Sequence, residues 1–228
     1  MYKTSSNYDQ FILKLVAKAP VRDRFTARLP VLIALGVFVM AGIFAFLFQI
    51  RLDFLNFFYD APIHSLNWQI GFKFILPILL LPMALFGLLK LGSPYGFKFK
   101  KSHIRYFGLI ALIMICALLA DIILSLFIKT NTHTHSVFAL APYGCVLSIT
   151  GLATPMLFLI LAAMRAGTPV QPVLSGIFAG AVAFSFAAMI YALHCPNDSM
   201  LHIVLWYGLA FVATTSLGGL LGHKLLRW

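Results

Sequence analysis

Six apolar segments of membrane-spanning length divide this chain and restrict its fold more than any other feature. Each has about 20 mostly apolar residues, the length that an α-helix needs to cross a hydrocarbon layer about 30 Å thick. Because backbone N–H and C=O groups must pair within the segment in lipid, such segments fold as helices. The sequence therefore predicts an all-α integral membrane six-helix bundle, with spans near residues 30–50, 68–89, 106–128, 143–164, 173–193 and 203–222.

The residues between the spans leave no room for a second folded domain. Hydrophobic residues make up 61% of the chain and charged residues only 10%, a balance typical of membrane proteins. The first apolar run begins at Pro30 and has full span length, so we expect a retained helix rather than a cleaved signal peptide. We expect two parts, a cytoplasmic N-terminal segment over 1–29 and a six-helix membrane domain over 30–228.

The basic residues predict which ends of the spans face the cytoplasm. The chain has 17 Lys and Arg against six acidic residues. If the N-terminus is inside, all basic residues except Arg51, Lys73 and Lys129 fall on the cytoplasmic side, as the positive-inside rule requires. Both termini are then cytoplasmic. Because the basic excess reports topology in such a protein, we expect the lipid bilayer as a partner and no direct binding of nucleic acid.

Two of the three cysteines fall on the outer side of this topology. Cys145 lies at the start of the fourth span and Cys195 in the short loop after the fifth. Because these spans run in opposite directions, both sulfurs reach the same membrane face, where they can close a disulfide or bind a metal ion. Cys145 can alternatively be a small packing residue. Cys195 should be exposed to oxidants and metals, whereas Cys116, within the third span, should be inert.

Histidine and aspartate add candidate metal ligands on the same side. His194 directly precedes Cys195, and Asp198 follows in the same loop. A metal site needs three or four converging N, S or O ligands, and Cys145, Cys195 and His194 form the candidate set. No spacing here matches an established zinc motif, so solvated loop histidines are the competing interpretation. The other histidines that map to the outer side are His64, His133, His135 and His202.

The N-terminal segment contains a short amphipathic stretch, FILKLVAKAPVR, that can act as a docking helix. Pro20 is expected to end this helix before the first span. Its apolar and basic faces can dock in an acidic, apolar groove of a partner protein or lie on anionic lipid, and the residues alone leave both open. The residues of these faces include Phe11, Leu15, Lys14, Lys18 and Arg22.

Two features within the spans bear on packing. The GxxxG pairs Gly176 with Gly180 and Gly218 with Gly222, on the fifth and sixth helices, favour close helix contacts, which we expect within the chain rather than between chains. Lys73 lies about one turn from the outer edge of its span, where we expect its side chain to reach the lipid headgroups.

Other function classes lack their expected signatures. The main alternative is a small polytopic transporter or metal-efflux component, but the chain has no clear repeat between its halves and no cluster of charged intramembrane ligands. An enzyme would be expected to carry a Cys-x-x-Cys, His-Glu-x-x-His or Gly-x-Ser-x-Gly motif, and none is present. We therefore expect a non-enzymatic protein without a resident cofactor.

The C-terminal stretch HCPNDSMLHIVLWYGLAFVATTSLGGLLGHKLLRW resembles that of the NrsF family. This family comprises membrane-embedded anti-sigma factors of Proteobacteria that restrain extracytoplasmic-function sigma factors. The elements that carry the resemblance are Cys195 with Pro196, the aromatic pair Trp206 and Tyr207, the glycines over 218–222 and the ending LLRW. The six-span layout and the basic N-terminus are also similar to this family over the whole chain.

The resemblance implies a protein that holds a sigma factor at the bacterial inner membrane until a stress acting from the periplasm releases it. In this family two outward-facing cysteines are associated with the response to heavy metals and oxidants, and Cys145 and Cys195 stand at the corresponding places. The family often has an acidic residue directly after Cys-Pro, where this chain has Asn197. The resemblance also favours the sigma factor as the partner of the N-terminal helix. The candidate supporting residues are His194, Pro196 and Asp198.

Overall fold

The computed structural model describes residues 21–48, 68–92, 101–127, 142–165, 169–195 and 202–226. Within these ranges every regular element is a helix, so the predicted all-α fold is confirmed. The elements are α2 (Val21–Leu47), α4 (Trp68–Leu91), α5 (Lys101–Phe127), α6 (Pro142–Arg165), α7 (Pro172–Ala192), the π-helical segment η2 (Ile203–Tyr207) and α9 (Gly208–Leu225).

Five of the predicted spans are helices long and apolar enough to cross a membrane. Their apolar parts are Arg28–Leu47, Lys73–Leu91, Tyr143–Arg165, Pro172–Ala192 and Ile203–Leu225, the last formed by η2 and α9 together. In α5 the apolar stretch that the structure describes, Gly108–Ala120, is shorter than a span. The third predicted span, 106–128, and the orientation of the termini therefore stay predictions.

Large apolar side chains cover the outside of the bundle. Phe46 is 89% exposed, Phe38 77% and Leu147 70%. In water such a surface would favour aggregation, whereas in lipid it is already in an apolar solvent. Together with the five span-length helices, this surface indicates insertion in a membrane.

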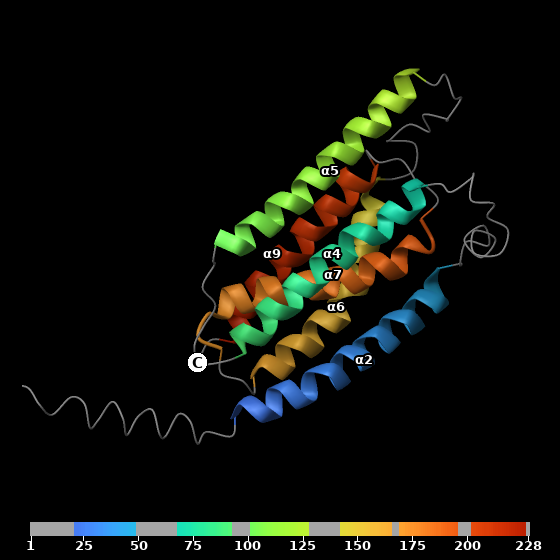
Figure 1. Cartoon of the computed structure of the whole chain (residues 1–228). Helices are drawn as coiled ribbons and strands as arrows, with labels where there is room; N and C mark the ends of the chain where they lie inside the picture. Colours follow the sequence, from blue (N-terminus) through green and yellow to red (C-terminus); the bar gives the residue numbers. More distant parts are fainter. Residues whose placement is uncertain are drawn as a thin grey trace, which may run out of the picture.

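Helix α7 lies at the centre of the bundle and contacts α2, α4, α6 and α9. Figure 1 shows α2 and α5 at opposite edges, with the other helices between them. Many buried residues of α7 are small, which lets neighbouring backbones approach closely. They include Ser175, Gly176, Ala179, Gly180, Ala183, Ser185, Ala187 and Ala188.

The close contact predicted within the chain for the GxxxG pairs is confirmed, and the structure shows that the two pairs meet each other, which joins α7 to α9. A Cβ atom added at Gly176 would lie 2.0 Å from the carbonyl oxygen of Gly218, and one added at Gly218 would lie 2.3 Å from that of Gly176. Cβ atoms at Gly180 and Gly222 would lie 2.7 Å and 2.6 Å from backbone oxygens of the opposite helix. We call these four residues the glycine seam. A larger residue does not fit there, so the seam holds the two backbones in direct contact.

Contacts at the two ends of the bundle show how the helices are directed. The Nε atom of Arg165 donates a hydrogen bond of 2.9 Å to the carbonyl oxygen of Leu225, which joins the last turns of α6 and α9. At the other end, Cys145 near the start of α6 contacts His202, just before η2. Helices α6 and α9 therefore run parallel. Helix α7 packs against both and runs in the opposite direction, so it ends where α6 and η2 begin.

Candidate thiol and metal site

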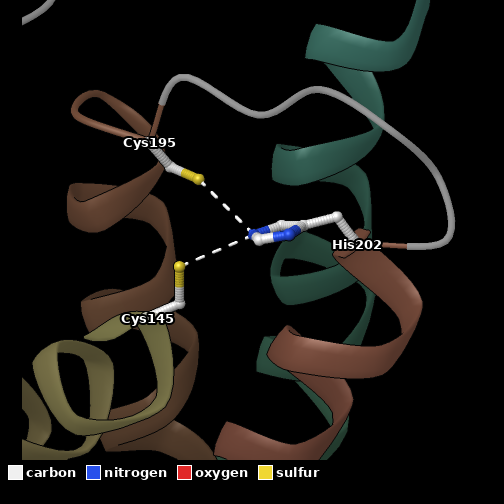
Figure 2. Close-up of side chains that lie close together, drawn as sticks. All are labelled: Cys145, Cys195 and His202. Carbon is white, nitrogen blue, oxygen red and sulfur yellow. Dashed lines mark hydrogen bonds between the residues drawn. The ribbon is translucent and has the colours of Figure 1, made fainter. Parts of the chain in front are cut away.

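Cys145, Cys195 and His202 converge at this end of the bundle. The Nε2 atom of His202 lies 3.5 Å from Sγ of Cys145 and 3.9 Å from Sγ of Cys195. All three ligand atoms lie within 4.8 Å of one another. Figure 2 shows both sulfurs directed toward the same ring nitrogen. The two cysteines thus meet at one end of the bundle, as the topology predicts, and both are free thiols.

Three helix ends position these side chains. Cys145 lies in the first turn of α6. Helix α7 ends at Ala192, but the backbone N–H groups of His194 and Cys195 still donate to the carbonyl oxygen of Tyr191, at 3.0 Å and 3.2 Å, which keeps Cys195 against the helix end. His202 directly precedes η2, and π-helical turns of this kind are often found at functional sites.

The site is enclosed. The side chains of Cys195 and His202 are only 1% and 4% exposed, and Cys145 is half-buried. The expectation that Cys195 is an exposed loop residue is therefore wrong. Its side chain turns inward toward His202 instead of outward from the end of α7, as Figure 2 shows.

Lys73 of α4 brings a basic side chain to the same end. Its Nζ atom donates a hydrogen bond of 2.8 Å to the backbone carbonyl oxygen of Cys195, and the side chain is 1% exposed. The expectation that Lys73 reaches the lipid headgroups is therefore wrong, because its position on α4 faces the bundle interior. A buried ammonium group is stable only with hydrogen-bond partners, so this contact ties α4 to the end of α7.

Two tyrosines lie next to the sulfurs. The hydroxyl of Tyr191 donates to Sγ of Cys145 at 3.5 Å. The hydroxyl of Tyr207 is buried beside Cys195. None of Lys73, Tyr191 and Tyr207 was predicted to belong to the site. The predicted topology places all three near the outer ends of their spans, and this position was the one feature of the sequence that could have indicated a place near the cysteines.

His194 lies beside the site but outside the cluster of ligand atoms. Its ring packs 5.0 Å from that of Phe48, 5.9 Å from that of Tyr191 and 6.5 Å from that of Phe44, measured between centroids. The structure therefore brings His202, rather than His194, to the two cysteines.

The other residues named from the sequence lie elsewhere. Cys116 is exposed on α5, away from the cluster. Arg22 falls in the first turn of α2, where its side chain is not described. The remaining candidates lie outside the described residues: Phe11, Leu15, Lys14, Lys18, Pro196, Asp198, His64, His133 and His135.

The chain matches a family model over residues 15–228, nearly its whole length. That model is described as NrsF, negative regulator of sigma F. The chain belongs to the NrsF family. This NrsF-family chain is 38% identical over 85 residues to the probable anti-sigma-F factor NrsF of Azospira oryzae. It is 39% identical over 85 residues to the anti-sigma-F factor NrsF of Caulobacter vibrioides.

Each of these two matches spans 37% of the NrsF-family chain and 40% of the relative. No solved structure matches the chain.

Proposed function

We propose that this protein is an anti-sigma factor of the bacterial inner membrane. It holds an extracytoplasmic-function sigma factor on the cytoplasmic side and releases it when Cys145 and Cys195, facing the periplasm, meet a metal ion or an oxidant. The observation that carries this proposal is the family match over residues 15–228, whose model is described as a negative regulator of sigma F. The names of the two curated relatives, both anti-sigma-F factors, support it. A regulator of this kind needs no catalytic motif, in keeping with the sequence.

The proposed topology separates the sensor from the partner. Helix α5 is the third of six spans, and both termini lie in the cytoplasm, where the basic residues gather. The thiol site then lies at the periplasmic end, and the contact of Arg165 with Leu225 lies at the cytoplasmic end. The amphipathic helix predicted before Pro20 is the docking element for the sigma factor.

Two reactions at the thiol pair can start the release. A soft metal ion can displace the thiol protons and bind both sulfurs. Alternatively, a peroxide can oxidise the pair: an S–S bond forms, the O–O bond breaks, and two electrons and two protons pass to the peroxide oxygens, which leave as water. Either reaction links the start of α6 to the end of α7.

Helix α7 can transmit a displacement at the thiol site to the cytoplasmic end of the bundle. Helix α7 contacts α2, α4, α6 and α9, and Lys73 connects its end to α4. A displacement of Cys195 therefore acts on several helices at once. To change the sigma factor from mostly bound to mostly free, the two arrangements must differ in affinity for it by about 5.5 kcal/mol.

Co-purification tests the proposed partner. The full-length chain and a variant lacking residues 1–28 are extracted from host membranes in mild detergent, and the proteins that travel with each are identified by mass spectrometry. We expect a sigma factor with the full-length chain and none with the shortened one. Absence of a sigma factor from the unstressed full-length sample would refute the proposal and favour solute or metal transport.

Cysteine variants test the proposed sensor. In a Cys145→Ser, Cys195→Ser double variant, the sigma factor should stay bound after the cells are exposed to cadmium or peroxide. The matched control is Cys116→Ser, because Cys116 is exposed on α5 and lies outside the cluster. This control should release the sigma factor as the unmodified protein does. Release from the double variant at the normal level would rule out the thiol pair as the sensor.

A further inference from the structure

We propose that Cys145, Cys195 and His202 together form a three-ligand site, with two sulfurs and one imidazole nitrogen, for a soft or borderline divalent metal ion such as Cd²⁺ or Zn²⁺. This inference deepens the proposed function, on which its biological meaning rests, by naming the ligands of the sensor. It also assigns the imidazole ligand to His202 instead of His194.

The distances between the ligand atoms fit a tetrahedral metal centre. With Zn–S bonds of about 2.3 Å and Zn–N bonds of about 2.0 Å, tetrahedral angles place S and N about 3.5 Å apart and the two sulfurs about 3.8 Å apart. In the structure Nε2 of His202 lies 3.5 Å and 3.9 Å from the two sulfurs, and no two ligand atoms are more than 4.8 Å apart. Small movements of the three side chains are therefore enough to bring the ligand atoms to bonding distance of one ion.

The ligand types select the class of ion. Thiolates favour soft or borderline ions, and imidazole binds the same borderline ions well, whereas Mg²⁺ and Ca²⁺ prefer oxygen ligands. Three protein ligands leave a fourth position for water or an exchangeable ligand, as in zinc sites that are not purely structural. Such a site can gain and lose its ion, as a sensor requires.

Neighbouring groups support the ligands. The Tyr191 hydroxyl donates to Sγ of Cys145, a contact of the kind that orients metal ligands from outside the coordination shell. Lys73 holds the backbone of Cys195 through its carbonyl oxygen. Because Lys73 and Cys195 are almost fully buried, the contact between them acts with little competition from solvent.

Cadmium binding to the purified full-length protein tests the proposal without the sigma factor. The reduced protein in detergent is titrated with Cd²⁺ alone, and the ultraviolet charge-transfer band between thiolate and cadmium reports occupancy. We expect one ion per chain. Replacement His202→Gln should weaken binding at least about 100-fold, since even groups outside the coordination shell typically account for 10–100-fold.

The matched control is His194→Gln, eight positions away and packed on aromatic rings. It should bind Cd²⁺ like the unmodified chain. If His202→Gln keeps the unmodified affinity, or if His194→Gln is the variant that loses it, the assignment of His202 is refuted.

X-ray absorption at the cadmium edge of the unmodified protein gives a test that does not depend on how a variant folds. It should show two sulfur neighbours together with the outer-shell scattering of one imidazole, and sulfur with oxygen but no imidazole would overturn the proposal. Because neither measurement involves the sigma factor, failure of the metal site and failure of the anti-sigma role can be told apart.

Discussion

Replacing Gly176 by alanine should separate the two helices that meet at the glycine seam. The added Cβ would lie 2.0 Å from the carbonyl oxygen of Gly218, whereas non-bonded carbon and oxygen atoms stay about 3.3 Å apart. The backbones must therefore move apart by about 1.3 Å at this point, given that contact limit. A gap of that size removes roughly half of the dispersion energy of the atoms that line it.

The expected cost follows from two opposing terms. Overpacking costs about 3 kcal/mol at the upper end of its usual range, which applies here because a backbone oxygen cannot escape by a rotamer change. Alanine offsets about 1 kcal/mol of this through its higher helix propensity. We therefore expect Gly176→Ala to lower the free energy of unfolding by about 2 kcal/mol.

The measurement is a titration of the purified full-length protein with sodium dodecyl sulfate in mixed micelles, followed by circular dichroism. Gly151→Ala is the control, because a Cβ at this exposed position of α6 meets no atom within 4 Å. By the same difference in helix propensity, and with no clash to oppose it, the control should be as stable as the unmodified protein or more stable by up to about 1 kcal/mol. Equal unfolding curves for the two variants would refute the close approach of α7 and α9.

Three further predictions concern buried polar groups. Cys195, 1% exposed, should react slowly with a water-soluble maleimide in the folded protein and fast after denaturation, as read by peptide mass spectrometry; equal rates would contradict its burial. Lys73→Met should speed this labelling roughly tenfold, because it removes the hydrogen bond to the carbonyl oxygen of Cys195, and a hydrogen bond from a charged group contributes about 1.5 kcal/mol or more. Lys90→Met, at an exposed position, should leave the rate unchanged. Ser175→Ala should keep or raise the free energy of unfolding by up to about 1 kcal/mol, because this buried hydroxyl has no hydrogen-bond partner in the described helices; a clear loss on detergent titration would show that it has one.

The arrangement of the helices was predictable because one physical requirement dominates it. An apolar segment must be long enough to cross the hydrocarbon layer, and α4, α6 and α7 begin and end within about two residues of the predicted spans. Helix α2 begins at Val21, before the predicted start at Pro30, because a helix can continue through polar residues that a count of apolar residues leaves out. Close packing at the two GxxxG pairs was also predictable, since only small residues permit such an approach, but the pairing of α7 with α9 came from the structure.

The site was predictable only in part, because topology gives the end of a helix but not its rotation. The alternating direction of the spans was enough to bring Cys145 and Cys195 together. The choice between His194 and His202 depends on how each helix end turns about its axis, and two residues in the same outer region take opposite roles. Lys73 was misread for the same reason, since a lysine one turn from the membrane edge can point outward or inward.

The π-helical segment η2 separates two parts of the last helix that have different tasks. A π-turn holds more residues than an α-turn, and each residue of an α-helix advances by about 100° around the axis. If η2 wound as an α-helix while the glycine seam kept α9 in place, His202 would be rotated away from the two sulfurs. The segment thus sets the phase between the thiol cluster at one end of the last helix and the glycine seam at the other.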